Sequence, residues 1–90
     1  MNTKETTYNG WTNYATWRVS LELFDGYEFE EEFYQHSTYD FSEHLRELAE
    51  EWTTFDCQNE IAKDYALAFL AQVNYYEIAE HIKEMHRCEV

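Results

Sequence analysis

The chain has 90 residues, which is enough for one compact domain and too few for a second hydrophobic core. Hydrophobic residues make up 44% of the chain and aromatic residues 19%, so it has the apolar surface that disordered segments lack. Nineteen acidic residues against six basic ones give a net charge of −13, which argues against direct binding to DNA, RNA or an anionic membrane.

The excess negative charge lies in the middle of the chain. Between Glu22 and Glu60, thirteen acidic residues are opposed by Arg46 alone, which leaves a charge of −12. The remaining residues carry six acids and five bases and are nearly neutral. Such a segment attracts basic surfaces, so a basic partner is expected.

The N-terminal segment, the lack of a long apolar stretch and the cysteines indicate the cellular compartment in which the protein is expected. The polar segment Met1–Thr7 lacks the basic and then apolar layout of a secretory signal, and no stretch approaches the roughly 20 apolar residues of a membrane span. We therefore expect a cytoplasmic protein. Cys57 and Cys88 are too few for a disulfide scaffold, and free thiols are favoured over a bridge.

The first elements in chain order are an arm and a helix. Residues 1–12 are expected to form an irregular arm that Tyr8 and Trp11 pin to the core. A helix is predicted over 14–24, with Asn13 as its N-cap and Gly26 as its C′ residue. Its predicted buried face, with three- and four-residue spacing, contains Tyr14, Trp17, Leu21 and Phe24, broadened by Val19 and Leu23.

Residues 27–36 fit two patterns. Tyr27 and Phe29 alternate with acids as in a strand, whereas Phe29 and Phe33 are one helical turn apart. We expect a short helix in this segment.

A second long helix is predicted over residues 41–52. The segment Asp40 to Glu43 has the spacing of a capping box, with Asp in place of the usual Ser or Thr. The apolar residues that follow recur on one face, which is typical of a helix packed against a core. They are Phe41, Leu45, Leu48 and Trp52.

Two further helices are predicted on either side of a break at Val73 and Asn74, where we expect a tight hairpin or corner. The helix that Asn59 caps is expected to be the most buried, because it has a wide apolar sector of Ile61, Ala62, Tyr65, Ala66, Phe69, Leu70 and Val73. Asn74 to Glu77 repeats the capping spacing, and Ile78, Ala79, Ile82 and Met85 are expected to face inward. The sequence therefore predicts a compact all-α domain of four helices, or five if residues 27–36 form one.

Catalytic and metal-binding motifs are missing from the sequence. His81 and His86 are five residues apart, which is not the spacing of a shared metal-binding face, and Cys57 is remote in sequence from Cys88. Two glycines do not make a phosphate-binding loop, and no cysteine has a base that can be placed beside it. We predict no catalytic residue, no cofactor and no metal site. A small enzyme or metal protein is the least favoured class.

The acids of the helix predicted over 41–52 share one face. At 100° per residue from Glu43, Glu47, Glu50 and Glu51 fall within about 80°, and the apolar residues lie on the far side. Four helical residues advance about 6 Å, comparable with two steps of about 3.4 Å along a DNA strand. This stripe and the acids 28–32 would present anions where a DNA-binding groove accepts phosphates. The alternative is an acidic surface that only favours solubility.

Two segments resemble those of known proteins. The segment 9–17, Asn-Gly-Trp-Thr-Asn-Tyr-Ala-Thr-Trp, resembles the Asn-Gly-Trp-x-Asn-Tyr-x-Thr-Trp opening of a group of small phage-encoded proteins, and Val73–Ala79 is similar to their closing segment. Among small acidic phage proteins, anti-CRISPR proteins are the nearest in kind, and some block type I, Cascade-like complexes by occupying their DNA channel. The resemblance implies that role in a bacterial host cytoplasm. It implies no catalytic or binding residue, and Trp11, Tyr14 and Trp17 are interpreted as core anchors.

The leading hypothesis is an inhibitor that mimics DNA and binds the basic DNA-binding surface of a host complex. The alternative is a module that binds another host protein, such as a polymerase or nuclease, through an aromatic patch. The residues expected to form the acidic surface are Glu28, Glu30, Glu31, Glu32, Glu43, Glu47, Glu50 and Glu51, with Asp25, Asp40 and Asp56 as weaker candidates.

Overall fold

The computed structural model describes residues 8–89, and side chains through Arg87. Residues 1–7 of the predicted arm lie outside the described part. The elements in order are α1 (Tyr14–Val19), the π-helical turn η2 (Ser20–Phe24), α2 (Glu31–Gln35), α3 (Thr38–Thr54), α4 (Glu60–Leu70) and α5 (Tyr75–Glu89). The described residues contain helices and no strand, so the prediction of an all-α domain is confirmed, including the short helix within 27–36.

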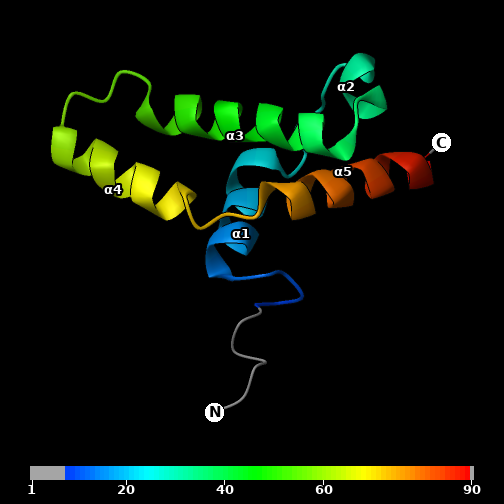
Figure 1. Ribbon diagram of the computed structural model, residues 1–90, viewed down its shortest axis with the longest axis horizontal. Coiled ribbons are helices and arrows are strands. Elements are labelled where there is room, and N and C mark those ends of the chain that lie inside the picture. Colours follow the sequence, from blue (N-terminus) through cyan, green and yellow to red (C-terminus); the bar gives the residue numbers. More distant parts are fainter. Residues whose placement is uncertain (1–7, 90) are drawn as a thin grey trace, which may run out of the picture.

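The longest helix, α3, runs antiparallel to both α4 and α5 and packs against each of them, most extensively against α5 (Figure 1). The α4–α5 connection is an open corner, so that the two helices follow one another along α3. The α1–η2 unit crosses near this corner, and α1 contacts α4. The core at this crossing contains Phe41, Leu45 and Ala49 of α3 and Ile78 and Ala79 of α5, all fully buried.

The first helix covers the predicted residues but buries a different face. Ala15, Thr16 and Val19 are buried, while Tyr14 and Leu21 are 42% and 50% exposed, so the prediction that these two are core residues is wrong. For Leu21 the reason is the π-helical turn in which it lies, whose wider spacing brings residues five apart onto the same side. Val19 and Phe24 are therefore both buried, although an ideal α-helix would separate them.

The part of the arm that the structure describes is a two-residue turn. Tyr8 and Trp11 exchange two backbone hydrogen bonds of 2.7 Å, and Asn9 and Gly10 between them have φ of 50° and 87°. Positive φ at both central residues is the geometry for which Asn-Gly is favoured. The Tyr8 ring packs 4.9 Å from Trp17, and Trp11 packs against the core, as predicted.

Asparagine caps fix three helix starts at predicted positions. The Oδ1 atoms of Asn13, Asn59 and Asn74 accept hydrogen bonds from the backbone N–H three residues on, at 2.8, 3.0 and 3.0 Å. Asn13 also donates through Nδ2 to the carbonyl of Gln72, at 2.8 Å, which ties the start of α1 to the α4–α5 corner. Gly26, with φ of 82°, follows the C-cap Asp25 as predicted.

The start of α3 differs from the sequence expectation. Ser37 is the N-cap, with its Oγ accepting from the N–H of Asp40 at 3.0 Å, so the helix begins at Thr38. Asp40 therefore lies in the first turn, where a carboxylate is favoured by the helix dipole, and it is not the capping residue. The hydroxyl of Ser37 reaches the free N–H groups first because the helical pattern extends one turn toward the N-terminus.

Further residues predicted to face the core are exposed, and those on α4 are exposed because that helix has few neighbours. Within α4 only Leu70 is buried, so this helix is not the most buried one as predicted. Ile61 and Tyr65 are 65% and 74% exposed, since α4 packs mainly along one side of α3. Met85 lies on the outer part of α5 at 50% exposure, and Trp52 is 37% exposed on the side of α3 that faces Tyr27.

Candidate partner-binding surfaces

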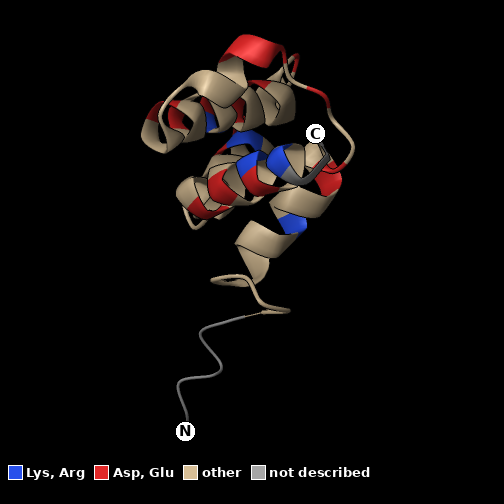
Figure 2. Cartoon of the chain, turned by 90° about the vertical axis from the view of Figure 1, so that its right-hand side faces the viewer, with Lys and Arg blue, Asp and Glu red and all other residues tan. Residues whose placement is uncertain are grey.

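The densest group of acids lies on the segment that leads into α2. We call it the acidic rim; it consists of Asp25, Glu28, Glu30, Glu31 and Glu32, all exposed. Figure 2 shows the acids of α2 as the red helical turn at the top of the molecule. The sequence places no Lys or Arg among residues 25–32, so the rim carries five carboxylates and no cation of its own.

Aromatic anchors hold the rim in place. Phe29 is buried, and its ring meets that of Phe41 at 5.1 Å. Phe33 stacks on His44 at 4.2 Å, and Tyr34 stacks on His86 at 3.7 Å. Between and beside these anchors the carboxylates of the rim are exposed to solvent. Among the described residues the rim's ion pair is the 3.4 Å contact between Glu31 and His86, which is ionic when the imidazole is protonated.

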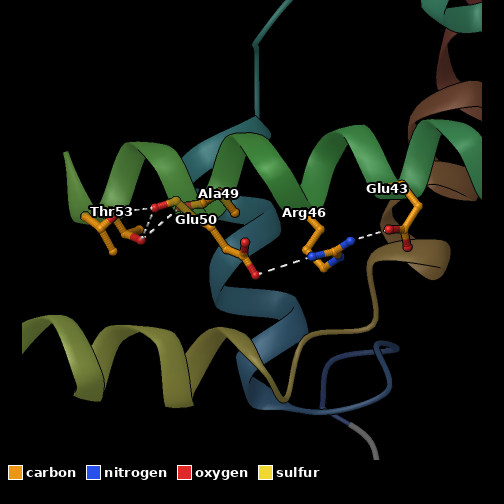
Figure 3. A network of polar contacts seen from close by, with 6 residues as sticks. Glu43, Arg46, Ala49, Glu50 and Thr53 are labelled. Carbon is orange, nitrogen blue, oxygen red and sulfur yellow. Dashed lines mark hydrogen bonds and ion pairs between the residues drawn. The ribbon is translucent and has the colours of Figure 1, made fainter.

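The acids of α3 do not behave as one free stripe. Arg46 lies between Glu43 and Glu50 and pairs with both, at 3.6 Å in the case of Glu50 (Figure 3). Hydrogen bonding to Glu43 raises the pKa of the Arg46 guanidinium above its ordinary value. Glu47 and Glu51 are exposed and lie one helical turn apart, with no ion pair within the part of the chain that the structure describes.

The two remaining aspartates of the predicted surface lie apart from each other. Asp40 is exposed in the first turn of α3, which begins next to α2. Asp56 is exposed in the α3–α4 connection at the other end of α3, with φ of 58°. Asp40 thus extends the rim, and Asp56 lies a helix length away from it.

An apolar surface that sequence reasoning missed lies at the end of the molecule opposite α2. We call it the apolar edge; it consists of Phe55, Ile61 and Tyr65, which are 79%, 65% and 74% exposed. The signal was present in the sequence, because α4 has apolar residues around most of its circumference and only three charged ones. A 90-residue domain rarely has enough other elements to cover such a helix on every side.

The described residues can also be searched for metal-binding clusters, cysteine pairs and membrane-spanning helices. There, no three His, Cys, Asp or Glu side chains are close enough together to hold a metal ion. Cys57 is a free thiol in the α3–α4 connection, and the side chain of Cys88 lies outside the described part. Between residues 8 and 89, no helix has both the length and the apolar character needed to cross a bilayer.

Comparison with known proteins identifies a family without an assigned role. The model of a family described as a family of unknown function (DUF7249) matches residues 4–88. No curated protein and no solved structure matches this chain.

Proposed function

The chain belongs to the DUF7249 family, and we propose that it is a binding protein that occupies a cationic, nucleic-acid-binding surface of another protein. In this proposal it mimics the polyanion and performs no catalysis. The observation that carries the proposal is the acidic rim, where five exposed carboxylates occur within eight residues without a Lys or Arg among them. Aromatic packing beneath the rim holds these charges at fixed positions, so little ordering entropy is lost on binding.

The second part of the proposed surface is the exposed side of α3. Glu47 and Glu51 lie about 6 Å apart along the helix axis, comparable with two phosphate steps of about 3.4 Å on a DNA strand. Glu43 and Glu50 contribute less, because Arg46 neutralises part of their charge. The rim and this pair together present seven exposed carboxylates to the basic partner.

The partner that we propose to test first is the DNA channel of a type I, Cascade-like CRISPR complex in a bacterial host. Support for this choice comes from the resemblance of residues 9–17 and 73–79 to small phage proteins, and from the acidic surface. Residues 9–17 serve the fold in this chain, since Asn9 and Gly10 form a turn and Asn13 caps α1. The acidic surface itself therefore has to be tested against the partner.

The test compares two double variants that change the net charge equally. E32K/E51K reverses one charge in the rim and one on α3, whereas D64K/E80K reverses two exposed acids on α4 and α5 outside the proposed surface. The measurement is displacement of labelled target DNA from the purified complex. We expect E32K/E51K to inhibit about tenfold less than the parent and D64K/E80K to stay within about twofold of it.

Two results would refute the proposal. One is equal inhibition by the parent and E32K/E51K, because the proposed surface would then not be used. The other is inhibition that barely weakens between 50 and 500 mM salt, since contacts between exposed charges are screened over this range.

A second candidate function rests on the apolar edge. Phe55 directly follows α3 and Tyr65 lies midway along α4; both are large and more than 70% exposed, which is typical of residues that dominate a protein interface. A polymerase or nuclease would then be bound through apolar contacts. The variant F55S/Y65S separates the two functions, because it would abolish apolar binding and leave charge-driven displacement of DNA unchanged.

A further inference from the structure

A cavity of about 300 Å³ lies between the η2 turn, the segment that follows it, and α5. Its walls contain both aromatic rings and carboxylates. Residues that matter for its chemistry are Trp11, Trp17, Tyr27, Tyr34, Asp25 and Glu28. The cavity therefore opens on the acidic rim but has an aromatic interior, and neither property follows from the charge pattern of the sequence alone.

We propose that this cavity is a socket for the guanidinium group of an arginine side chain on the basic partner. The faces of Trp and Tyr rings attract cations, and a carboxylate at the mouth adds a charged hydrogen-bond acceptor. Arginine fits better than lysine because its planar group stacks on rings and bonds carboxylates through two N–H groups at once. The inference rests on the proposed function and names the side chain by which the partner is recognised.

The rings of the socket are fixed before any ligand arrives. Trp17 is held by Tyr8 at 4.9 Å and by Tyr14 at 5.7 Å between ring centroids. Tyr27 meets Trp52 at 5.3 Å, and Tyr34 stacks on His86 as described above. Tyr8, Tyr14 and Trp52 do not line the cavity, whereas His86 lines it beside Tyr34. These contacts hold the rings in place, so the cavity is preformed and binding does not have to order it.

The backbone around the socket has the features of a built site. The π-helical turn contributes Ser20, Leu21 and Phe24 to its wall, and π-helical turns are frequent at functional sites. Directly after this turn, Gly26 adopts φ of 82°, which reverses the chain between the two carboxylates. Asp25 and Glu28 form no ion pair within the described residues, so both are available to a cationic ligand.

The socket can be tested on the isolated protein with N-acetyl-arginine amide as the probe. Binding is followed through the indole N–H signals in NMR spectra, because Trp11 and Trp17 line the cavity and Trp52 does not. We expect the signals of Trp11 and Trp17 to shift with a Kd on the order of 1 mM, and that of Trp52 to stay unchanged. The amide of N-acetyl-citrulline, which has nearly the same shape without the charge, should cause no shift.

Two double variants locate the binding. D25N/E28Q removes the carboxylates at the socket, and D64N/E80Q removes two exposed carboxylates on α4 and α5 that do not line it and lie outside the proposed surface. Each variant neutralises two charges and changes only exposed side chains. An unchanged Trp52 signal in the spectrum of each variant serves as the check that the fold is retained. We expect D25N/E28Q to weaken binding of the arginine amide about tenfold and D64N/E80Q by less than twofold.

Several outcomes would overturn the socket. Equal shifts from the arginine and citrulline amides would mean that no cation is recognised, and equal weakening in the two variants would mean that only the overall charge is felt. A saturable shift confined to Trp52 would place the ligand elsewhere. These measurements use the isolated protein, so they are independent of the DNA displacement test. If no arginine binding is found, the proposed role of Glu32 and Glu51 in displacing DNA is unaffected, and if DNA is not displaced, the result of the arginine titration still stands.

Discussion

At Thr16 a single hydroxyl group joins the two ends of the domain. The side chain is fully buried, and its Oγ1 accepts the N–H of Asn74 at 2.9 Å while donating to Oδ1 of Asn13 at 2.7 Å. It thereby connects the cap of α1 with the residue that caps α5. Since α1 and α5 are far apart in sequence, this residue helps to fix where the helices cross.

We predict that Thr16→Val destabilises the protein by about 1–3 kcal/mol, because the shape is kept while the N–H of Asn74 loses its acceptor in a part-buried position. Thr16→Ser keeps the hydroxyl and should lose less, about 1 kcal/mol for the missing methyl group. Urea unfolding followed by circular dichroism measures both variants. A Val variant at least as stable as the Ser variant would refute the role of the hydroxyl.

Tyr75 makes stability depend on pH above the neutral range. Burial, and next the charge of Glu50, raise the pKa of Tyr75 to about 12 from its ordinary 10.0, and Arg46 opposes the rise. The unfolded chain loses this proton near pH 10, whereas the folded protein keeps it to about pH 12. The folded state therefore binds more protons in this window, and its stability is complete below pH 10 and falls as the pH rises toward 12.

The prediction is a loss of about 2 kcal/mol between pH 9 and pH 12 from this residue alone. Tyr75→Phe should lack this component. It should also be no less stable than the parent at pH 7, since the hydroxyl of Tyr75 has no hydrogen-bond partner among the described residues. Urea midpoints across the range test this, and parallel losses in the two proteins would contradict it.

At the scale of the element, α4 has a weaker hold on the rest of the molecule than α3 or α5. It is 11 residues long but buries only Leu70 fully, whereas α3 buries Phe41, Leu45 and Ala49. Short isolated helices are only marginally stable in water, so a helix depends on the apolar face that it packs against its neighbours.

We predict that amides 62–67 of α4 exchange with solvent at least about tenfold faster than amides 42–49 of α3, through local opening that leaves the other helices intact. Hydrogen exchange followed by NMR at pH 7 measures this difference. The first turns of α5, which contain the buried Ile78 and Ala79, serve as the internal control. Uniform protection across the three helices would show that α4 opens only with the whole domain.

Helix positions could be predicted from the sequence because their signals are local. Asn13, Asn59 and Asn74 were recognised as caps from a few neighbouring residues, and the structure confirms each of them. Buried faces were harder, because they depend on which elements come to lie opposite. Leu21 was misplaced by a π-helical turn that no simple periodicity reveals, and Tyr65 by a helix that the fold leaves open on one side.

At the scale of the whole molecule, the sequence predicted the amount of charge and not its arrangement. The density of acids from 25 to 32 was visible, but its proximity to the aromatic cavity depends on α5 folding back against η2. The partial neutralisation of α3 by Arg46 was within reach, since Glu43 and Glu50 are three and four residues away from it. The apolar edge required knowledge of how α4 packs.

With a net charge of −13 on 90 residues, repulsion among the carboxylates destabilises the folded state, and added salt should screen this repulsion. We predict that raising sodium chloride from 20 to 500 mM increases the melting temperature by about 5 °C, because the carboxylates of the rim and of α3 are screened from one another. The variant E32K/E51K should show a smaller increase. Calorimetry measures both, and a melting temperature that falls or stays constant in the parent would contradict the prediction.

The placement of the acidic rim and the apolar edge at opposite ends of α3 gives the molecule a direction (Figure 1). The rim carries five carboxylates within eight residues and no Lys or Arg among them, so in the proposed function a basic surface would attract this part of the molecule first, and diffusion would bring it in with α2 leading. Phe55, Ile61 and Tyr65 would then trail away from the first encounter. Encounters in other orientations would lead to binding less often, because the long-range attraction would orient the molecule before its side chains contact the partner.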